Sequence, residues 1–491
     1  MLYEWPTADD PPPNDGGNAA GPTLAALAAA AAILLVTDAA HAIRFRIRTY
    51  SIGRATQTST VRRGLANQQI FTQGLDLRAY DLTGQRTGDL NAVVDARYTT
   101  DFNLPQNRVD DPPFAHQWNN IALRLSYLEY QPGRAFRARL GRQWSRGTLG
   151  IRDFDGLRLT VRPRLEPGLR ALLEGYGGRD VQVGLAPYNT DEFDVQGLPA
   201  RNEGEFVGGV DATRWLAGGR LGMTFEDTGA IEFAYRRRWH GTGDDLRVGS
   251  ERFGTALSMS PHPRITVAAD AIYHSMLQGV DQAALDIAWN TPWLIDTLSF
   301  GLEHRHPWFD ASSIWNIFGT RPHQGAYAVA RKGVPALATD FELRGWGRLY
   351  RGSEARSRSA RIGDADVARV GAALAHESAI YPYDHPVDWS SQISVEADTG
   401  LEESTHLLAD TRLRSPMFFD DFYLSGRLLV LGVDGHDRSV ASTVATTFVL
   451  GAEIPIRELG ALSLTAERTV GWTIRATTEL YGTLELEIWP G

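Results

Sequence analysis

Cysteine is absent from the 491 residues of the sequence. Its absence excludes a disulfide-stabilised fold, a thiolate zinc site, an iron–sulfur cluster and a cysteine nucleophile. A basic excess is also missing, because 49 Lys and Arg residues stand against 59 Asp and Glu residues. The resulting net charge of −10 argues against a nucleic-acid-binding domain, which needs a basic face.

Long hydrophobic runs are missing too, with one short exception near the N-terminus. Residues 24–36 are all apolar, but a transmembrane helix needs about 20 such residues. This segment and the small-x-small pattern Ala40-His41-Ala42 are typical of a cleaved secretory signal, although the usual basic N-terminal region is missing. We predict a leader over residues 1–42 and one domain over residues 43–491. The alternative for the leader is a tethering helix or a disordered tail.

Apolar and polar side chains alternate through most of the chain after the leader. Residues 157–162 read Leu-Arg-Leu-Thr-Val-Arg, and residues 231–236 read Ile-Glu-Phe-Ala-Tyr-Arg. A period of two indicates strands with one apolar and one polar face. Helical periodicity is nearly absent beyond residue 43, and no linker or repeat divides the chain. We therefore predict an all-β protein with a single domain.

The segments between the predicted strands alternate in length. Short connections include residues 131–134 and 226–229. Long ones are expected at residues 51–67, 100–119, 179–213, 306–324 and 351–364. Short turns at one end and long loops at the other are typical of an outer-membrane barrel, with the short turns in the periplasm. The segments amount to about 22 strands, in a range of about 18 to 24, each with about ten spanning residues.

A sheet can cross hydrocarbon only if it closes, because every backbone N–H and C=O group there must be paired. The principal alternative is a soluble β-sandwich, which also alternates but hides its apolar face between two sheets. A chain of this length would need several sandwich domains, and the sequence has no boundaries between them. We predict a single closed antiparallel transmembrane β-barrel in the cell outer membrane.

Residues 137–163 contain Leu-Gly-Arg-Gln and, about ten residues later, Asp-Phe-Asp-Gly-Leu-Arg-Leu. This segment resembles one found in bacterial outer-membrane porins of the alginate-export-like family, where it is a strand, an outer loop and the next strand. The resemblance implies a barrel without a plug and an arginine-bearing lumen for anionic sugars. It also implies that Arg139, Arg142 and Arg158 are lumen residues.

The alternation itself assigns a wider set of arginines to the polar face. An arginine-lined pore would attract anions, because guanidinium groups pair with carboxylates and phosphates. The alternative is a ladder of mixed charges that only hydrates the wall, since acids such as Glu232 share this face. With Arg142, which only the resemblance adds, the candidate pore-lining residues are Arg124, Arg137, Arg139, Arg142, Arg158, Arg162, Arg236, Arg238, Arg344 and Arg348.

No catalytic or cofactor signature accompanies this pattern. The Gly-x-Ser-x-Gly, His-Glu-x-x-His and phosphate-loop motifs are absent from the sequence, so we expect no enzyme, no cofactor and no metal centre. Acidic residues in the predicted loop 179–213 could narrow the pore or bind calcium, or could simply be solvated.

The expected function is an outer-membrane channel that passes hydrophilic, anionic solutes or polysaccharide. The alternative is a non-conducting barrel that serves as a structural or surface-binding platform. Expected partners are outer-membrane lipid with lipopolysaccharide and small hydrophilic or sugar-acid solutes. Nucleic acid is not expected, and the oligomeric state stays open.

The face assignment can be tested by replacing Arg137 and Arg139 with glutamate. If both side chains line a pore, the double variant should still assemble but should shift ion preference towards cations, as measured by reversal potential. Loss of heat-modifiable folding would instead mean that the two faces are inverted.

Overall fold

The computed structural model describes residues 44–60, 64–82, 88–101, 119–181, 213–226, 228–242, 245–291, 294–306, 322–350, 366–381, 387–399, 404–417, 419–435, 443–456, 459–471 and 474–488. The chain divides into Met1–Ile43 and Arg44–Gly491. The leader predicted over residues 1–42 lies outside the described residues and stays a prediction. No helix among the described residues is long and apolar enough to span a bilayer.

Strands make up nearly all of the described chain. In order they are β1 Arg44–Thr60, β2 Gly64–Tyr80, β3 Asp89–Asp101, β4 Asn119–Gln131, β5 Phe136–Ser145, β6 Arg152–Val161, β7 Arg164–Glu166, β8 Leu169–Val181, β9 Thr213–Phe225, β10 Gly229–Thr242, β11 Asp245–His262, β12 Ile265–His274, β13 Gly279–Asn290, β14 Thr297–Arg305, β15 His323–Val334, β16 Thr339–Tyr350, β17 Val367–Ile380, β18 Val387–Thr399, β19 Ser404–Met417, β20 Phe419–Gly435, β21 Thr443–Ile456, β22 Gly460–Gly471 and β23 Ile474–Ile488.

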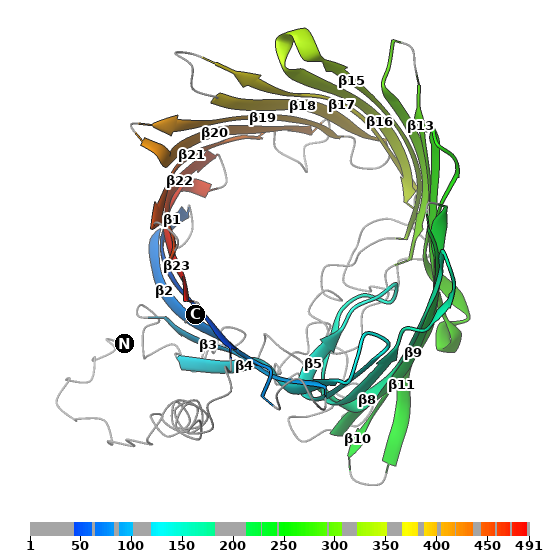
Figure 1. Ribbon diagram of the computed structural model, residues 1–491. Helices are drawn as coiled ribbons and strands as arrows, with labels where there is room; N and C mark the ends of the chain where they lie inside the picture. Colours follow the sequence, from blue (N-terminus) through cyan, green and yellow to red (C-terminus); the bar gives the residue numbers. More distant parts are fainter. Residues whose placement is uncertain are drawn as a thin grey trace, which may run out of the picture. The chain divides into compact units, whose positions relative to one another are not determined.

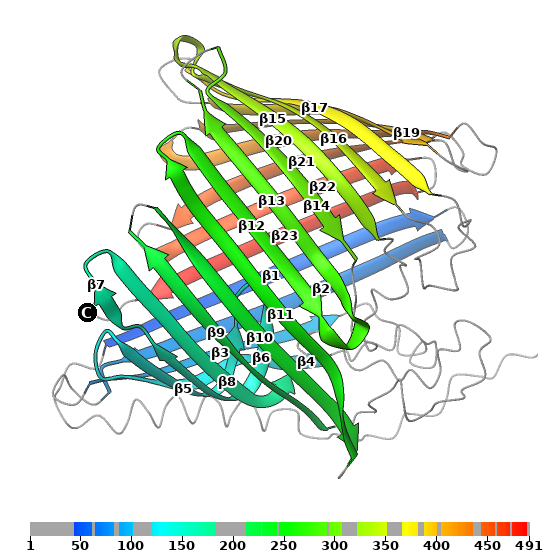
Figure 2. The ribbon, with the colours of Figure 1, turned by 90° about the vertical axis from the view of Figure 1, so that its right-hand side faces the viewer.

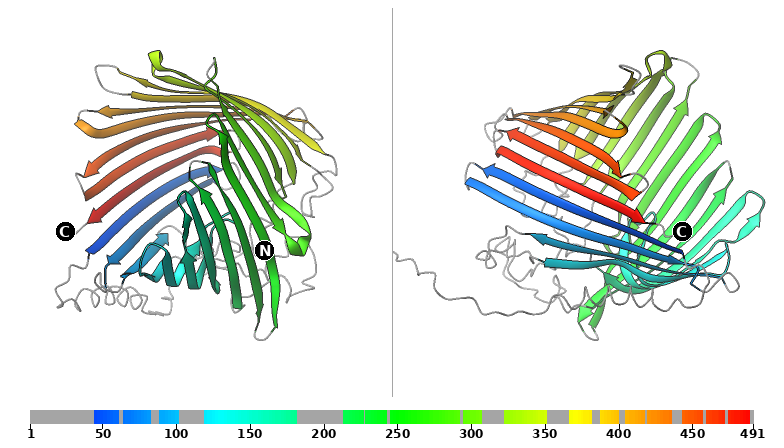
Figure 3. Two further views of the ribbon diagram at one scale, coloured as in Figure 1. Left: turned by 45° about the vertical axis from the view of Figure 1, so that its right-hand side comes forward. Right: turned by 60° about the vertical axis from the view of Figure 1, so that its left-hand side comes forward.

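The strands form one closed antiparallel sheet. Each long strand pairs with its neighbour in sequence, and β23 returns to pair with β1, from Ile47 opposite Ile488 to Thr60 opposite Ile474. The three-residue β7 pairs only with β8, and β6 pairs with β8 directly. The wall built by the described residues therefore has 22 strands, as predicted. Figure 1 shows the ring, Figure 2 the oblique strands, and Figure 3 the red β23 beside the blue β1.

Large apolar side chains point away from the barrel axis and are exposed. Leu140 is 60% exposed, Leu343 57% and Phe300 51%, and their neighbours along each strand are largely polar or charged. A soluble sandwich would bury such residues, because each costs about 1.5–3 kcal/mol when it is left in water. An apolar outer face on a closed barrel is the arrangement required in a bilayer. The chain is thus an outer-membrane β-barrel, and the predicted fold class is confirmed.

The predicted long connection over residues 51–67 is wrong. Strands β1 and β2 run through most of it, and only residues 61–63 separate them. Gln57 lies opposite Asn67 in a continuous antiparallel register. The sequence there is polar on both faces, which indicated a loop. Backbone pairing does not require apolar side chains, so a hairpin can continue beyond the apolar belt.

Ion pairs join the first and last strands at the point where the barrel closes. Three arginines of β1 face three glutamates of β23 on the inner side of the wall. The pairs are Arg46 with Glu487 at 2.8 Å, Arg48 with Glu485 at 2.5 Å, and Arg54 with Glu479 at 2.7 Å. No turn connects β1 to β23, so this seam is held only by main-chain pairing and side-chain contacts.

The double variant Glu485→Gln/Glu487→Gln should lower the temperature at which the barrel loses its heat-modifiable migration in detergent gels. Each pair is half-exposed and stabilises the fold by up to about 1 kcal/mol. The control is Glu342→Gln, which removes a 2.7 Å pair with Arg331 between β15 and β16. A short connection already tethers those strands, so the control should shift less. Equal shifts per pair would contradict a special role for the seam.

Candidate functional site: an inward hairpin

Strand β5 leaves β4 part of the way along its length, whereas β6 stays paired with β8 as far as Asp153, opposite Val181. Strand β4 pairs with β5 only between Tyr130, opposite Ala138, and Ser126, opposite Arg142. Beyond that point β5 and β6 continue to pair with each other as far as Ser145 and Arg152. We call residues 143–154 the inward hairpin, because this end lies inside the ring of strands (Figure 1).

A row of glycines crosses three strands where the hairpin bends. Gly141 of β5 lies opposite Gly156 of β6, which lies opposite Gly178 of β8. Gly141 has a φ of +124°, a backbone conformation that favours glycine. A Cβ atom at Gly156 would collide with the Gly177 carbonyl oxygen, and one at Gly178 would collide with that of Asp155. The strands can approach this closely only without side chains.

Three arginines of the wall hold the backbone of the hairpin tip. Each guanidinium donates a hydrogen bond to a main-chain carbonyl oxygen of the tip. The bonds are Arg158 Nη1 to Trp144 at 3.2 Å, Arg220 Nη1 to Arg146 at 2.9 Å, and Arg236 Nη2 to Leu149 at 2.7 Å. They come from β6, β9 and β10, so the tip is fixed to several strands at once.

Glu232 of β10 also holds the tip, but it accepts hydrogen bonds from the tip, whereas the three arginines donate to it. Its Oε1 atom accepts hydrogen bonds from the backbone N–H of Thr148 at 3.0 Å and from the Thr148 hydroxyl at 2.8 Å. Its Oε2 atom lies 3.3 Å from Arg220 Nη1. The carboxylate therefore binds the hairpin and one of its arginines together.

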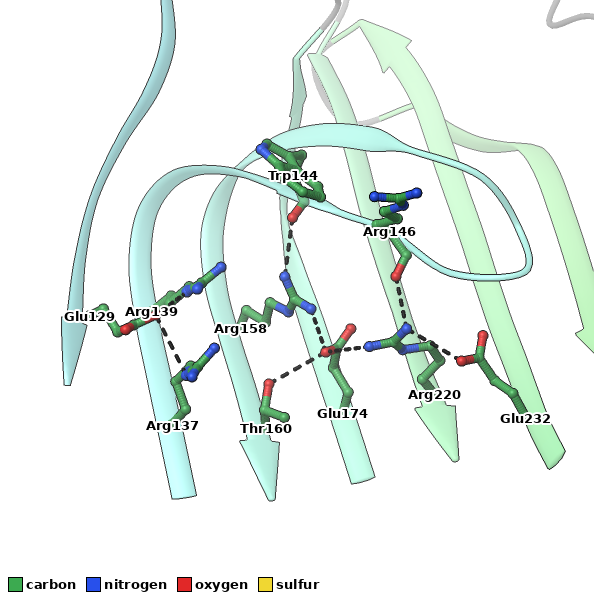
Figure 4. Close-up of polar contacts among 10 residues, drawn as sticks. All are labelled: Glu129, Arg137, Arg139, Trp144, Arg146, Arg158, Thr160, Glu174, Arg220 and Glu232. Carbon is green, nitrogen blue, oxygen red and sulfur yellow. Dashed lines mark hydrogen bonds and ion pairs between the residues drawn. The ribbon is translucent and has the colours of Figure 1, made fainter. Parts of the chain in front are cut away.

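Glu174 of β8 orients two of these arginines, as Figure 4 shows. Its side chain is 1% exposed. Its Oε2 atom accepts hydrogen bonds from Arg158 Nη2 at 2.5 Å and Arg220 Nη2 at 3.1 Å, and lies 3.4 Å from the Thr160 hydroxyl. Each arginine thus spans from one buried carboxylate to one hairpin carbonyl. Removing one member of such a buried group is strongly destabilising, because it leaves another charge unpaired.

Apolar packing supports the same hairpin. The three largest fully buried side chains among the described residues are Phe154, Leu216 and Gln143. Phe154 and Gln143 belong to the hairpin, and Leu216 lies opposite Gly178, at the end of the glycine row. The ring of Phe154 lies 5.5 Å from that of Tyr176. A small packed core therefore lies inside the barrel, where an open lumen would have none.

Two of the predicted arginines lie together beside the hairpin. Arg139 forms an ion pair of 2.5 Å with Glu129, and Arg137 lies 3.6 Å from the same carboxylate. Arg137 also donates to the Gln131 side chain. Arg139 lies 4.8 Å above the ring of Tyr127. Tyr127 therefore lies on the same face of the sheet as Arg139.

The other predicted arginines are more widely spread, and each has its own surroundings. Arg142 lies on the opposite strand face from Arg139, where β5 meets the hairpin. It donates to both oxygens of Asp155 at 2.7 Å and to the Leu123 carbonyl oxygen. Arg162 lies in the connection between β6 and β7 and is exposed. Arg124 lies 4.0 Å from Asp95, and Arg238 lies 2.6 Å from Asp180.

Arg344 and Arg348 lie on β16, which pairs with β15 and β17 and not with the strands around the hairpin. Arg348 forms an ion pair of 2.7 Å with Glu303. Arg344 lies 5.2 Å from the ring centre of Tyr327 and 5.8 Å from that of Trp346. The structure thus brings Arg158 and Arg236 to the hairpin. It places Arg344 and Arg348 on a different part of the wall.

The sequence pattern did not identify Arg220 and Glu174, two of the residues that hold the hairpin. Arg220 lies in the sequence Gly-Gly-Arg-Leu-Gly, where glycines obscure the alternation. Glu174 lies in a clearer strand, but nothing in its neighbourhood distinguishes it from an ordinary solvated acid. The inward position of residues 146–151 has one local signal, the glycines at 141, 147, 150 and 156.

No group of three or more metal-ligating side chains occurs among the described residues. The acidic loop that was considered as a constriction or calcium site lies, between residues 182 and 212, outside the described residues. Among the described residues, the β5–β6 connection lies inside the ring of strands (Figure 1).

No protein-family model matches the sequence, and no curated protein is similar to it. Solved structures that resemble the barrel include OccAB1 of Acinetobacter baumannii, with a TM-score of 0.43 and 8% identity over 91% of this chain and 97% of that chain. They also include Pseudomonas aeruginosa OpdK with vanillate (TM-score 0.40, 8% identity, 90% and 99% covered) and the P pilus usher pore PapC (0.39, 8%, 90% and 99%). Resemblances at this level do not identify a substrate, and the alginate-export-like family stays a prediction.

Adding a methyl group to the glycine row should destabilise the hairpin. Gly178→Ala should reduce stability by about 1–3 kcal/mol, because its Cβ would collide with the Asp155 carbonyl. The matched control is Gly175→Ala in the same strand, where no atom lies within 4 Å of the new Cβ. Thermal unfolding and protease cleavage within residues 146–151 measure the effect. Equal behaviour of the two variants would mean that the row does not set the bend.

Proposed function

We propose that the chain is an outer-membrane channel that conducts small hydrophilic solutes and prefers anions. The observation that carries this proposal is the inward hairpin, held by arginines of the inner wall rather than by an apolar interface alone. Such an arrangement narrows a wide barrel without filling it with a separate domain. A barrel of this strand number is otherwise wide enough for an aqueous channel or a plugged lumen.

The preference for anions follows from the charges beside the hairpin. Five arginines and three glutamates make up the charged groups in Figure 4. Arg236 adds a further positive charge nearby, and it donates its hydrogen bond to a neutral carbonyl oxygen. A low-dielectric wall concentrates the field of this excess charge in the lumen. The candidate pore-lining arginines Arg137, Arg139, Arg158 and Arg236 belong to this group.

Small carboxylates, sugar acids among them, are the class of solute that we propose. A guanidinium group matches a carboxylate with two parallel hydrogen bonds, which a neutral sugar cannot form. The family resemblance adds polysaccharide export as a narrower prediction. Outer-membrane lipid and lipopolysaccharide are the proposed surroundings of the apolar outer face.

The experiment is single-channel recording of the refolded barrel in a planar bilayer under a salt gradient. We expect stable conductance steps and a reversal potential of the sign for anion preference. Deletion of residues 147–150 should increase the conductance, because it removes most of the hairpin tip. Arg158→Gln/Arg220→Gln should weaken anion preference, and Arg331→Gln, which lies outside the hairpin contacts, should change it less.

Two results would contradict this function. Cation preference would mean that the arginines are neutralised by their carboxylate partners and only hydrate the wall. A folded barrel without conductance would favour the alternative, a structural or surface-binding platform closed by its hairpin and loops.

A further inference from the structure

We propose that the inward hairpin covers a binding site for a carboxylate group, formed by Arg220 and Arg236 when a solute takes the place of the hairpin carbonyl oxygens. This inference rests on the proposed function and adds to it a particular place and a movement. The site is hidden while Arg146 and Leu149 hold the two guanidinium groups through their carbonyl oxygens.

The first reason is the chemistry of the present partners. A backbone carbonyl is a neutral acceptor, whereas guanidinium groups form stronger hydrogen bonds with carboxylates. The bond from Arg236 to Leu149 is therefore open to competition by an anionic solute. The bond from Arg220 to Arg146 is open to it as well, but there the solute joins Glu174 and Glu232, which already pair with this guanidinium group. The hydrogen bonds that Glu232 accepts from Thr148 also hold the tip. A solute that displaces the tip must therefore form contacts that compensate for the loss of these bonds.

The second reason is the incomplete satisfaction of Arg236. Its side chain is 3% exposed, and its Nη1 atom is buried without a hydrogen-bond partner in the described part of the chain. Three further arginines, Arg152, Arg238 and Arg252, add positive charge around it, and two of them are paired, Arg238 with Asp180 and Arg252 with Asp281. Burying a charge among like charges is costly, and a bound carboxylate would remove this cost.

The third reason is that the hairpin can bend without breaking the barrel wall. Beyond Arg142, β5 is not paired with β4, and the tip, residues 146–151, belongs to no strand, so the tip can move while β6 stays paired with β8 as far as Asp153. The glycine row that includes Gly141 and Gly156 provides the place to bend. Gly147 and Gly150 give the tip itself the same freedom, and Gly150 has a φ of +76°.

A disulfide between the hairpin and β11 tests this movement directly, because the chain has no cysteine of its own. A Cβ atom built at Gly254 lies 3.2 Å from Thr148 Cγ2, close to the distance that a disulfide spans between a Cβ and the partner sulfur. It also lies 2.8 Å from Leu149 Cδ2, so the Leu149 side chain must shift in the double variant and in the Gly254→Cys control alike. The variant is Thr148→Cys/Gly254→Cys, recorded oxidised and then reduced. The two single-cysteine variants are the controls, since they carry the substitutions without the bridge.

The probe is glucuronate, with glucose as the neutral solute of similar size. In the wild type and in the reduced double variant, glucuronate should raise the channel conductance to a saturating level, and glucose should not. Oxidation should abolish this rise and reduction should restore it. Arg236→Gln should also reduce the rise. A response that is unchanged by oxidation, or a block of current that is equal in both states, would overturn the inference.

A second measurement does not depend on conduction. In the single variant Thr148→Cys, glucuronate but not glucose should accelerate the reaction of the introduced thiol with a maleimide, because the tip leaves its contact with β11. A labelling rate that glucuronate does not change would overturn the inference of a hidden site. Failure of the double variant to oxidise would also overturn it, since the tip would then not rest against β11.

The two proposals can fail separately. Cation preference or electrical silence, together with accelerated labelling of the thiol in Thr148→Cys, would refute the anion channel and leave the binding site. An anion-selective channel whose response to glucuronate survives the disulfide would refute only the hidden site.

Discussion

The backbone of this protein must satisfy its hydrogen bonds without water, and the rest of the structure depends on this constraint. A sheet in hydrocarbon has no tolerated edge, so β23 must return to β1. Closure then fixes which face is apolar, because alternate side chains must point to lipid and to the interior. The ion pairs between the arginines of β1 and the glutamates of β23 lie at the one junction that no turn connects.

Closure also means that the interior of the barrel does not have to be a packed apolar core. The wall is stable through its main-chain pairing, so its inner face can carry arginines and carboxylates in contact with one another. Two of these arginines, Arg158 and Arg220, share the buried Glu174 and each reach a carbonyl oxygen of the hairpin. The charges that line the barrel therefore also position the segment that narrows it.

The hairpin combines packed apolar side chains, as in a protein core, with polar contacts of the kind found on a protein surface. Its packed apolar residues, Phe154 among them, include the largest fully buried apolar side chain of the described residues. Its carbonyl oxygens, which are neutral, accept hydrogen bonds from arginines of the wall, and Thr148 donates to Glu232. Packing keeps the hairpin inside, whereas the neutral partners of the arginines leave it exposed to competition by anions. The proposed conduction, selectivity and movement thus all involve one short segment.

The sequence by itself determined the fold class, the approximate strand number and the presence of short turns between neighbouring strands. These follow from local rules, because a period of two and a turn composition are visible within about ten residues. The sequence did not determine that residues 51–67 continue two paired strands, since polar composition indicates a loop and backbone pairing leaves no local trace. Only the tertiary structure brought Glu174, Arg220 and Glu232 to the hairpin, because their partners lie 12 to 84 positions away along the chain. Such contacts depend on which strands are neighbours and on a bend at three glycines that meet across the sheet.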